Sequence, residues 1–325
     1  MKVWARAAVS LGLLALLFVF LPWHEARDAF RKVPLSLWVA VLTGFILGHM
    51  VGVVKWRMLV NSGSVRLGLF DALRAYSAGL FTNICLPGIV GGDVIRATLA
   101  ARRMDRAGDV IAAGIVDRAI DIASLALVTA IGGILVGRTA AGPTATTIGI
   151  AAGASAVVAL VFVLLMIRRR LSAWPRRFRR PIGRTLAALR RLSSQPSTIL
   201  FCALLSIAMQ VWFVVLNIFI GRSLGINVPG AVWFFTWSLA KVAALVPISL
   251  GGLAVRDAAF AALIAPFGVP LTTGVVASLV WQSIVIAGGL IAGALSQVLG
   301  GDARSAFRLG TPRPPGVDPS WRKSA

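Results

Sequence analysis

Ionisable side chains interrupt stretches of sequence that are otherwise apolar, in two comparable parts of the chain. A charged group inside a membrane-length apolar segment is costly, so each one indicates a functional site by default. The first set comprises Asp93, Arg96, Asp117, Arg118 and Asp121, and the second comprises Lys241, Arg256 and Asp257. Both sets contain an arginine, which points to an anionic ligand.

The two arginines occupy favourable places for binding an anion. Arg96 and Arg256 each lie one turn into a helix that we expect to begin after a Gly-Gly pair. Free backbone N–H groups and the positive end of the helix dipole attract phosphate or carboxylate there, and arginine binds such groups bidentately. We predict that Arg96 and Arg256 bind the anionic part of a substrate, together with Asp93, Ser249 and Lys241.

The acidic residues allow two interpretations. Asp117 and Asp121 share a helix face, and the depth of Asp121 requires a basic partner, for which Arg96 and Arg118 are the candidates. In one interpretation these residues and Asp93 form an ionic network that only holds the helices together. In the other, the network leaves one arginine available to the substrate.

Simpler structural roles stay open for three of the predicted residues. Asp93 and Ser249 are residue types that cap helix N-termini. Lys241 has no acid close in sequence and could extend its ammonium group towards the membrane interface. Asp257 follows Arg256 directly and belongs to the supporting network.

Each charged set accompanies a break in a long apolar region, at about 68–104 and 228–267. The first set follows its break, whereas Lys241 precedes the second break and Arg256 and Asp257 follow it. Proline removes a backbone donor and glycine lowers helix propensity, so a helix–break–helix hairpin is expected in each region. Both breaks have the pattern P-x3-G-G-x3-R, at an offset of 160 residues. The break residues are Pro87, Gly91 and Gly92 in the first copy and Pro247, Gly251 and Gly252 in the second.

The composition is that of a membrane protein. Of 325 residues, 58% are hydrophobic and 14% charged, with a mean hydropathy of +0.87. We predict an all-α polytopic membrane protein with two broken or re-entrant hairpins and about six full transmembrane helices. These spans are expected at 3–22, 35–59, 110–137, 144–167, 197–221 and 271–298.

The basic residues predict the orientation of the chain. The net charge is +22, and loop 168–191 holds ten arginines and no acid. Such loops are cytoplasmic, and counting spans from this one places both termini in the cytoplasm, as well as Lys55, Arg57 and Arg66. Because three full spans separate the hairpins, the second hairpin is inverted relative to the first, and both breaks meet near the midplane. Paired broken helices of this kind mark a transport site.

One transmembrane domain, 1–300, therefore accounts for most of the chain. Its two halves, about 35–167 and 197–298, are joined by the basic linker 168–195, and a disordered cytoplasmic tail is expected at 301–325. The basic loops fit anionic lipid headgroups and the positive-inside rule, and we expect no nucleic-acid partner.

No enzyme motif, nucleotide-binding loop or metal-ligand spacing is present in the sequence. The cysteines, Cys85 and Cys202, and the histidines, His24 and His49, are isolated. We predict no catalytic activity, no metal and no cofactor.

The motifs resemble those of the flippase-like lysylphosphatidylglycerol synthase transmembrane family. Ala254 and Asp257 stand where that family usually has Gly and Glu. Members that make lysyl-lipids carry a cytoplasmic aminoacyl-transfer domain, which is not found here, so the resemblance implies the lipid-translocating half. The segments that carry the resemblance are 83–87, 91–96, 116–118 and 247–257.

We therefore predict a lipid flippase of the bacterial inner membrane, which moves an anionic lipid or lipid-linked intermediate across the bilayer. The alternatives are a secondary transporter of a small soluble anion and a non-transporting membrane subunit of a lipid-modifying enzyme. A second copy of the chain and a lipid-modifying enzyme are the candidate protein partners.

Overall fold

The computed structural model describes residues 31–63, 66–85, 90–102, 107–139, 187, 190–192, 194–244 and 253–300. Within these ranges every regular element is a helix, and the prediction of an all-α membrane protein is confirmed. The elements are α3 (Leu35–Asn61), α4 (Leu69–Cys85), α5 (Val90–Ala101), α6 (Ala107–Thr139), α9 (Pro196–Ser223), α10 (Gly230–Ala243), α11 (Leu253–Ile264), the 3-10 turn η2 (Ala265–Phe267) and α12 (Leu271–Val298).

Four of the helices are long and apolar enough to cross a membrane. These are α3, α6, α9 and α12, with 27 to 33 residues each. A helix rises about 1.5 Å per residue, so each of them exceeds the roughly 30 Å of the hydrocarbon core. They coincide with the spans predicted at 35–59, 110–137, 197–221 and 271–298, whereas 3–22 and 144–167 lie outside the described residues.

The remaining helices are too short to span the membrane alone. α4 has 17 residues and α10 has 14, while α5 and α11 have 12 each, or about 18 Å of length. α4 packs against α5, and α10 packs against α11, so each pair is a helical hairpin. The hairpin tips, with Pro87, Pro247, Ser249, Gly251 and Gly252, lie outside the described residues.

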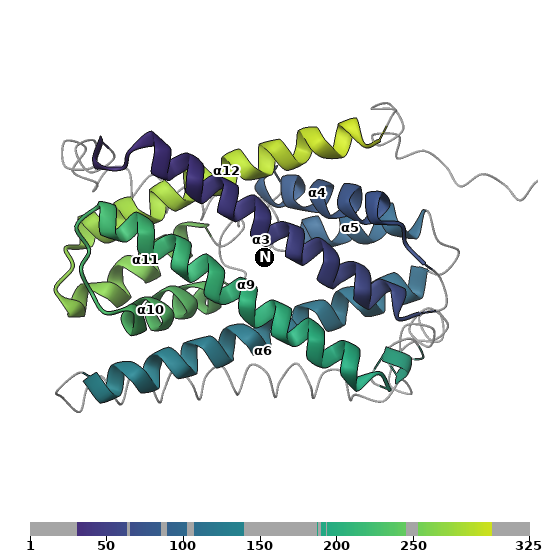
Figure 1. Ribbon diagram of the computed structural model, residues 1–325, viewed down its shortest axis with the longest axis horizontal. Coiled ribbons are helices and arrows are strands. Elements are labelled where there is room, and N and C mark those ends of the chain that lie inside the picture. The colour runs from purple at the N-terminus through teal and green to yellow at the C-terminus, as the bar shows by residue number, and fades with distance from the viewer. Residues whose placement is uncertain are drawn as a thin grey trace, which may run out of the picture.

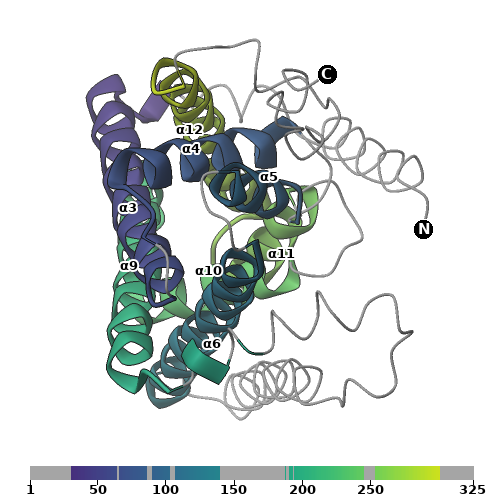
Figure 2. The same ribbon diagram turned by 90° about the vertical axis from the view of Figure 1, so that its right-hand side faces the viewer.

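The two halves repeat one order of elements: a long helix, a hairpin and a second long helix. Figure 1 shows α4 and α5 towards one end of the bundle and α10 and α11 towards the other, while the long helices run between the ends. Seen at 90° in Figure 2, α3 and α9 lie together along one side of the bundle. This opposed arrangement is the one that the 160-residue repeat predicts.

The halves interlock at both hairpins. α4 packs against α12, and α10 packs against α6, so the first helix of each hairpin rests on the last long helix of the other half. Large aromatic side chains fill the core of the second half, where Trp233 and Trp237 on α10, Phe260 on α11 and Trp281 on α12 are almost fully buried. The two charged sets are therefore held within one bundle.

The outer surface of the bundle is apolar. Leu47 and Phe70 in the first half and Leu200, Leu204 and Leu290 in the second expose more than half of their surface. In a bilayer these side chains contact lipid tails, which removes any need for a polar exterior.

Candidate functional site

A doubly hydrogen-bonded ion pair joins α5 to α6 in the first half. Arg118 on α6 donates two hydrogen bonds to Asp93 on α5, from Nε to Oδ2 at 2.6 Å and from Nη2 to Oδ1 at 2.8 Å. This bidentate geometry is the strong form of the arginine–carboxylate pair. Asp93 lies in the first turn of α5, so it serves Arg118 rather than capping the helix as its residue type allowed.

Arg96 is held on every side. Its Nη2 lies 3.0 Å from Asp117 Oδ2 and 3.2 Å from Asp93 Oδ1. Its guanidinium carbon also lies 4.7 Å from the ring centroid of Trp56 and 5.3 Å from that of Tyr76. The residue is only 6% exposed. Both carboxylates and both aromatic rings fix Arg96 in place, with its charge already paired.

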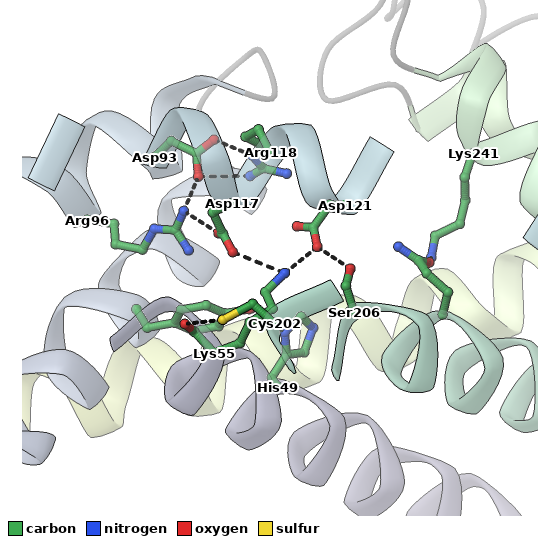
Figure 3. Close-up of polar contacts among 12 residues, drawn as sticks. His49, Lys55, Asp93, Arg96, Asp117, Arg118, Asp121, Cys202, Ser206 and Lys241 are labelled. Atoms are coloured by element: carbon green, nitrogen blue, oxygen red, sulfur yellow. Dashed lines mark hydrogen bonds and ion pairs between the residues drawn. The ribbon is translucent and has the colours of Figure 1, made fainter. Parts of the chain in front are cut away.

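Lys55 completes this network and corrects the predicted partner of Asp121. It is 2% exposed, and its Nζ lies 3.0 Å from Asp117 Oδ1. Lys55 also donates to Asp121, which accepts a further bond of 2.6 Å from Ser206 Oγ on α9. The partner of Asp121 is therefore Lys55 and not Arg96 or Arg118 (Figure 3).

A signal for Lys55 was present in the sequence. The apolar span was expected to continue to residue 59, and α3 in fact ends at Asn61. A lysine before the last turn of a span lies within it and needs a partner, unlike a lysine beyond its end.

The Gly-Gly pair of the first hairpin has a different role from the one predicted. α5 begins at Val90, so Gly91 and Gly92 lie inside its first turn and not in the break. A Cβ on Gly92 would lie 2.3 Å from the carbonyl oxygen of Gly79 and 2.3 Å from Asn83 Oδ1. The Gly92 N–H donates to the same Asn83 oxygen at 3.0 Å. Glycine is required at 92 because α4 and α5 approach each other closely there.

The second half has a similar, smaller arrangement around Arg256 on α11. Its Nε and Nη2 donate to Asp257 Oδ1 at 2.9 and 2.7 Å, and Nη2 also donates to Gln282 Oε1 on α12 at 2.8 Å. The guanidinium carbon lies 5.5 Å from the ring centroid of Trp237. In both hairpins, therefore, the arginine of the repeat stacks on an aromatic ring of the preceding helix, Tyr76 or Trp237.

Lys241 lies in the last turn of α10, apart from the ionic network of the first half (Figure 3). Its Nζ donates to Gln210 Oε1 at 2.8 Å and lies 5.5 Å from the ring centroid of Phe213, both on α9. Among the described residues no carboxylate lies within ion-pair distance of this ammonium group. The side chain points into the bundle and lines the cavity, so the alternative in which its ammonium group extends to the membrane interface is not adopted.

A cavity of about 600 Å³ brings the two charged sets together. That volume is typical of a small-molecule or cofactor site. Part of its wall is apolar, and the rest is polar and charged. The apolar wall includes Leu80, Ile122, Leu125, Met209 and Phe213, and the basic groups that line it are Arg96, Arg118, Lys241 and Arg256.

The predicted charged residues thus divide into two groups. The cavity is lined by Arg96, Asp93, Asp117, Arg118 and Asp121 from the first half and by Lys241 and Arg256 from the second. Asp257 lies behind Arg256 as its partner. Across the part of the chain that the structure describes, no three His, Cys, Asp or Glu side chains are placed to hold a metal ion.

Comparison with known proteins gives one family. The family described as lysylphosphatidylglycerol synthase TM region matches residues 3–293, a range that includes both charged sets and both hairpins. No curated protein and no solved structure matches the chain. The resemblance found in the motifs is therefore confirmed.

Proposed function

The chain belongs to the lysylphosphatidylglycerol synthase TM region family, and we propose that it binds the anionic headgroup of a membrane lipid and carries it across the bilayer. The proposal places the chain in the bacterial cytoplasmic membrane with both termini in the cytoplasm. It includes no chemical step, no cofactor and no nucleic acid.

One observation carries this proposal: cations from both halves line a single cavity that also has an apolar wall. The cations suit a phosphate group, and the wall of Leu80, Ile122, Leu125 and Met209 suits the start of an acyl or prenyl chain. A small soluble anion would need only the polar part of this cavity. The apolar wall therefore favours a lipid over the soluble anion.

The interlocked hairpins suggest how the cavity changes access. α4 rests on α12 and α10 rests on α6, so movement of one half against the other displaces both hairpins at once. Since the hairpins lie towards opposite ends, the same movement opens one end and closes the other. Throughout such a cycle the carboxylates keep Arg96, Arg118 and Arg256 paired. Their charges are therefore compensated even when no substrate is bound in the cavity.

A reconstituted transport assay tests the proposal. Phosphatidylglycerol with a fluorophore on one acyl chain is placed in both leaflets of liposomes that contain the purified protein. A membrane-impermeant reductant then bleaches only the outer leaflet. Wild-type protein should expose the inner-leaflet lipid to bleaching, and the Arg96→Ala/Arg256→Ala variant should not.

Two controls make the assay decisive. Arg222→Ala removes an exposed arginine outside the cavity and should transport as wild type does. Arg256→Gln is a milder substitution that keeps a polar side chain beside Gln282. It tests the role of the Arg256 charge if the double variant does not fold. If wild-type protein transports no lipid but accumulates a soluble anion, the secondary-transporter function holds instead. If it transports neither and co-purifies with a transferase, it is an accessory subunit.

A further inference from the structure

Among the residues that the structure describes, the charges around the cavity balance except for one. Four carboxylates and four cations form the ion pairs of the two clusters, and each carboxylate has a basic partner within 4 Å. Lys241 is a fifth cation that lines the same cavity. One cation is left over, which gives this region a single excess positive charge. The pairs are Arg118 with Asp93, Arg96 with Asp117, Lys55 with Asp121 and Arg256 with Asp257, and the remaining cation is Lys241.

Lys241 also has hydrogen-bonding capacity to spare. An ammonium group has three N–H donors, and Gln210 Oε1 accepts one of them at 2.8 Å. Within the described ranges the other two have no protein acceptor. Phe213 covers one side of the group at 5.5 Å, and Lys241, Gln210 and Phe213 all line the cavity.

The protein stabilises this lone charge only weakly. Lys241 lies in the last turn of α10, where the carbonyl end of the helix dipole favours a cation, and the Gln210 oxygen and Phe213 ring add to this effect. Such dipolar contacts are weaker than the contact with a carboxylate that every cation of the two clusters has. An anion that enters the cavity therefore gains most by binding at Lys241, where it displaces no existing partner.

We propose that Lys241 is the residue that contacts the transported headgroup, and that this headgroup carries one net negative charge, as a phosphodiester does. This inference rests on the proposed lipid transport and narrows its substrate. A phosphodiester has one negative charge and two free oxygens, which match the one excess charge and the two donors of Lys241 that have no acceptor among the described residues. A phosphomonoester carries about −1.5 to −2 at neutral pH, so its second charge would have no cation left to neutralise it.

Binding of short-chain lipids to the purified full-length chain in detergent tests the inference. The probes are dioctanoyl phosphatidylglycerol, a phosphodiester monoanion, dioctanoyl phosphatidylcholine, a zwitterion, and dioctanoyl phosphatidic acid, a phosphomonoester. Glycerophosphoglycerol has the same phosphodiester without the chains and separates a lipid from a soluble source. Apparent Kd values are measured for wild type and for Lys241→Gln, Lys241→Arg and Lys32→Gln.

Wild-type protein should bind phosphatidylglycerol at least about 30-fold more tightly than phosphatidylcholine. This ratio corresponds to the smallest loss of affinity that is typical when a buried charge pair loses one partner. Lys241→Gln keeps a hydrogen bond to Gln210 but should lose that preference. Lys241→Arg keeps the charge and should retain most of it. Lys32→Gln changes an exposed lysine outside the cavity and should bind as wild type does.

Three results would overturn the inference. Lys241→Gln could keep the full preference for phosphatidylglycerol, phosphatidic acid could bind about tenfold more tightly than phosphatidylglycerol, or glycerophosphoglycerol could bind as tightly as the lipid. The liposome assay distinguishes an incorrect role of Lys241 from an incorrect proposed function. If wild type and Lys241→Gln transport phosphatidylglycerol equally, only the role of Lys241 is wrong, whereas absence of lipid transport by wild type refutes the proposed function itself.

Discussion

Removing the charge of Lys55 should strongly destabilise the protein. Its ammonium group lies between Asp117 and Asp121, and the side chain is 2% exposed. In Lys55→Met, Asp117 keeps Arg96 as a partner, but Asp121 keeps only the Ser206 hydroxyl. Removing one partner of a fully buried ion pair costs about 3–5 kcal/mol. The Asp121 side chain is 29% exposed, so the cost of Lys55→Met should lie towards the lower end of this range.

A second substitution identifies the source of that cost. Asp121→Asn alone should be milder than Lys55→Met, because Lys55 retains Asp117. The double variant Lys55→Met/Asp121→Asn removes the lone carboxylate as well, so it should be more stable than Lys55→Met alone. We expect a coupling energy of about 1–3 kcal/mol between the two positions.

Thermal unfolding in detergent measures these differences. Lys55→Met should lower Tm on the order of 5–10 °C, and the double variant should recover part of that fall. Lys32→Met replaces an exposed lysine and should leave Tm almost unchanged. If the costs of the two single substitutions simply add in the double variant, Lys55 and Asp121 do not interact and the network described here is wrong.

Two further substitutions test the first hairpin. Gly92→Ala should lower stability by about 1–3 kcal/mol, because its Cβ would lie 2.3 Å from the backbone oxygen of Gly79. In the control Gly114→Ala the new Cβ meets no atom within 4 Å, so this variant should be neutral or stabilising in the same thermal assay. Equal Tm values for both variants would contradict the close approach of α4 and α5. Arg118→Lys keeps the charge but loses the bidentate pair with Asp93, so lipid transport should fall several-fold while Tm changes little; transport at the wild-type rate would show that this geometry is not needed.

The long helices and the opposed hairpins could be predicted because their signals are local. A run of about 20 apolar residues indicates a span by its length alone. Pro87 and Pro247 interrupt such runs at the same offset from Arg96 and Arg256, which indicates the repeat without any knowledge of packing. Four described spans accordingly match the prediction to within a few residues.

The ion pairs could not be predicted because they join distant parts of the chain. Lys55 and Asp121 are separated by 66 residues, and Asp121 and Ser206 by 85. Arg96 and Arg118 were nearer in sequence to Asp121 and offered equally good chemistry, so sequence distance favoured the wrong partner. Only the packing of α3 beside α6 decides the pairing.

Gln282 shows the same limit in the second half. It is an uncharged residue in the middle of α12, with nothing in its neighbourhood to mark it, yet it is the second acceptor for Arg256. Gly92 was recognised as significant but misinterpreted, since a glycine that permits close packing and a glycine that breaks a helix look alike in sequence.

The division of contacts between the two halves also determines how the chain can be made. Residues 55–121 contain all three cations and all three carboxylates of the first network, so these charges can pair before the ribosome has synthesised the second half. Arg256 likewise finds its partners within the second half. Helix packing, in contrast, joins the two halves, because α4 packs against α12, the last helix of the described chain. Charge neutralisation can therefore precede translation of the C-terminal half, whereas the first hairpin can reach its final position only after α12 has been inserted.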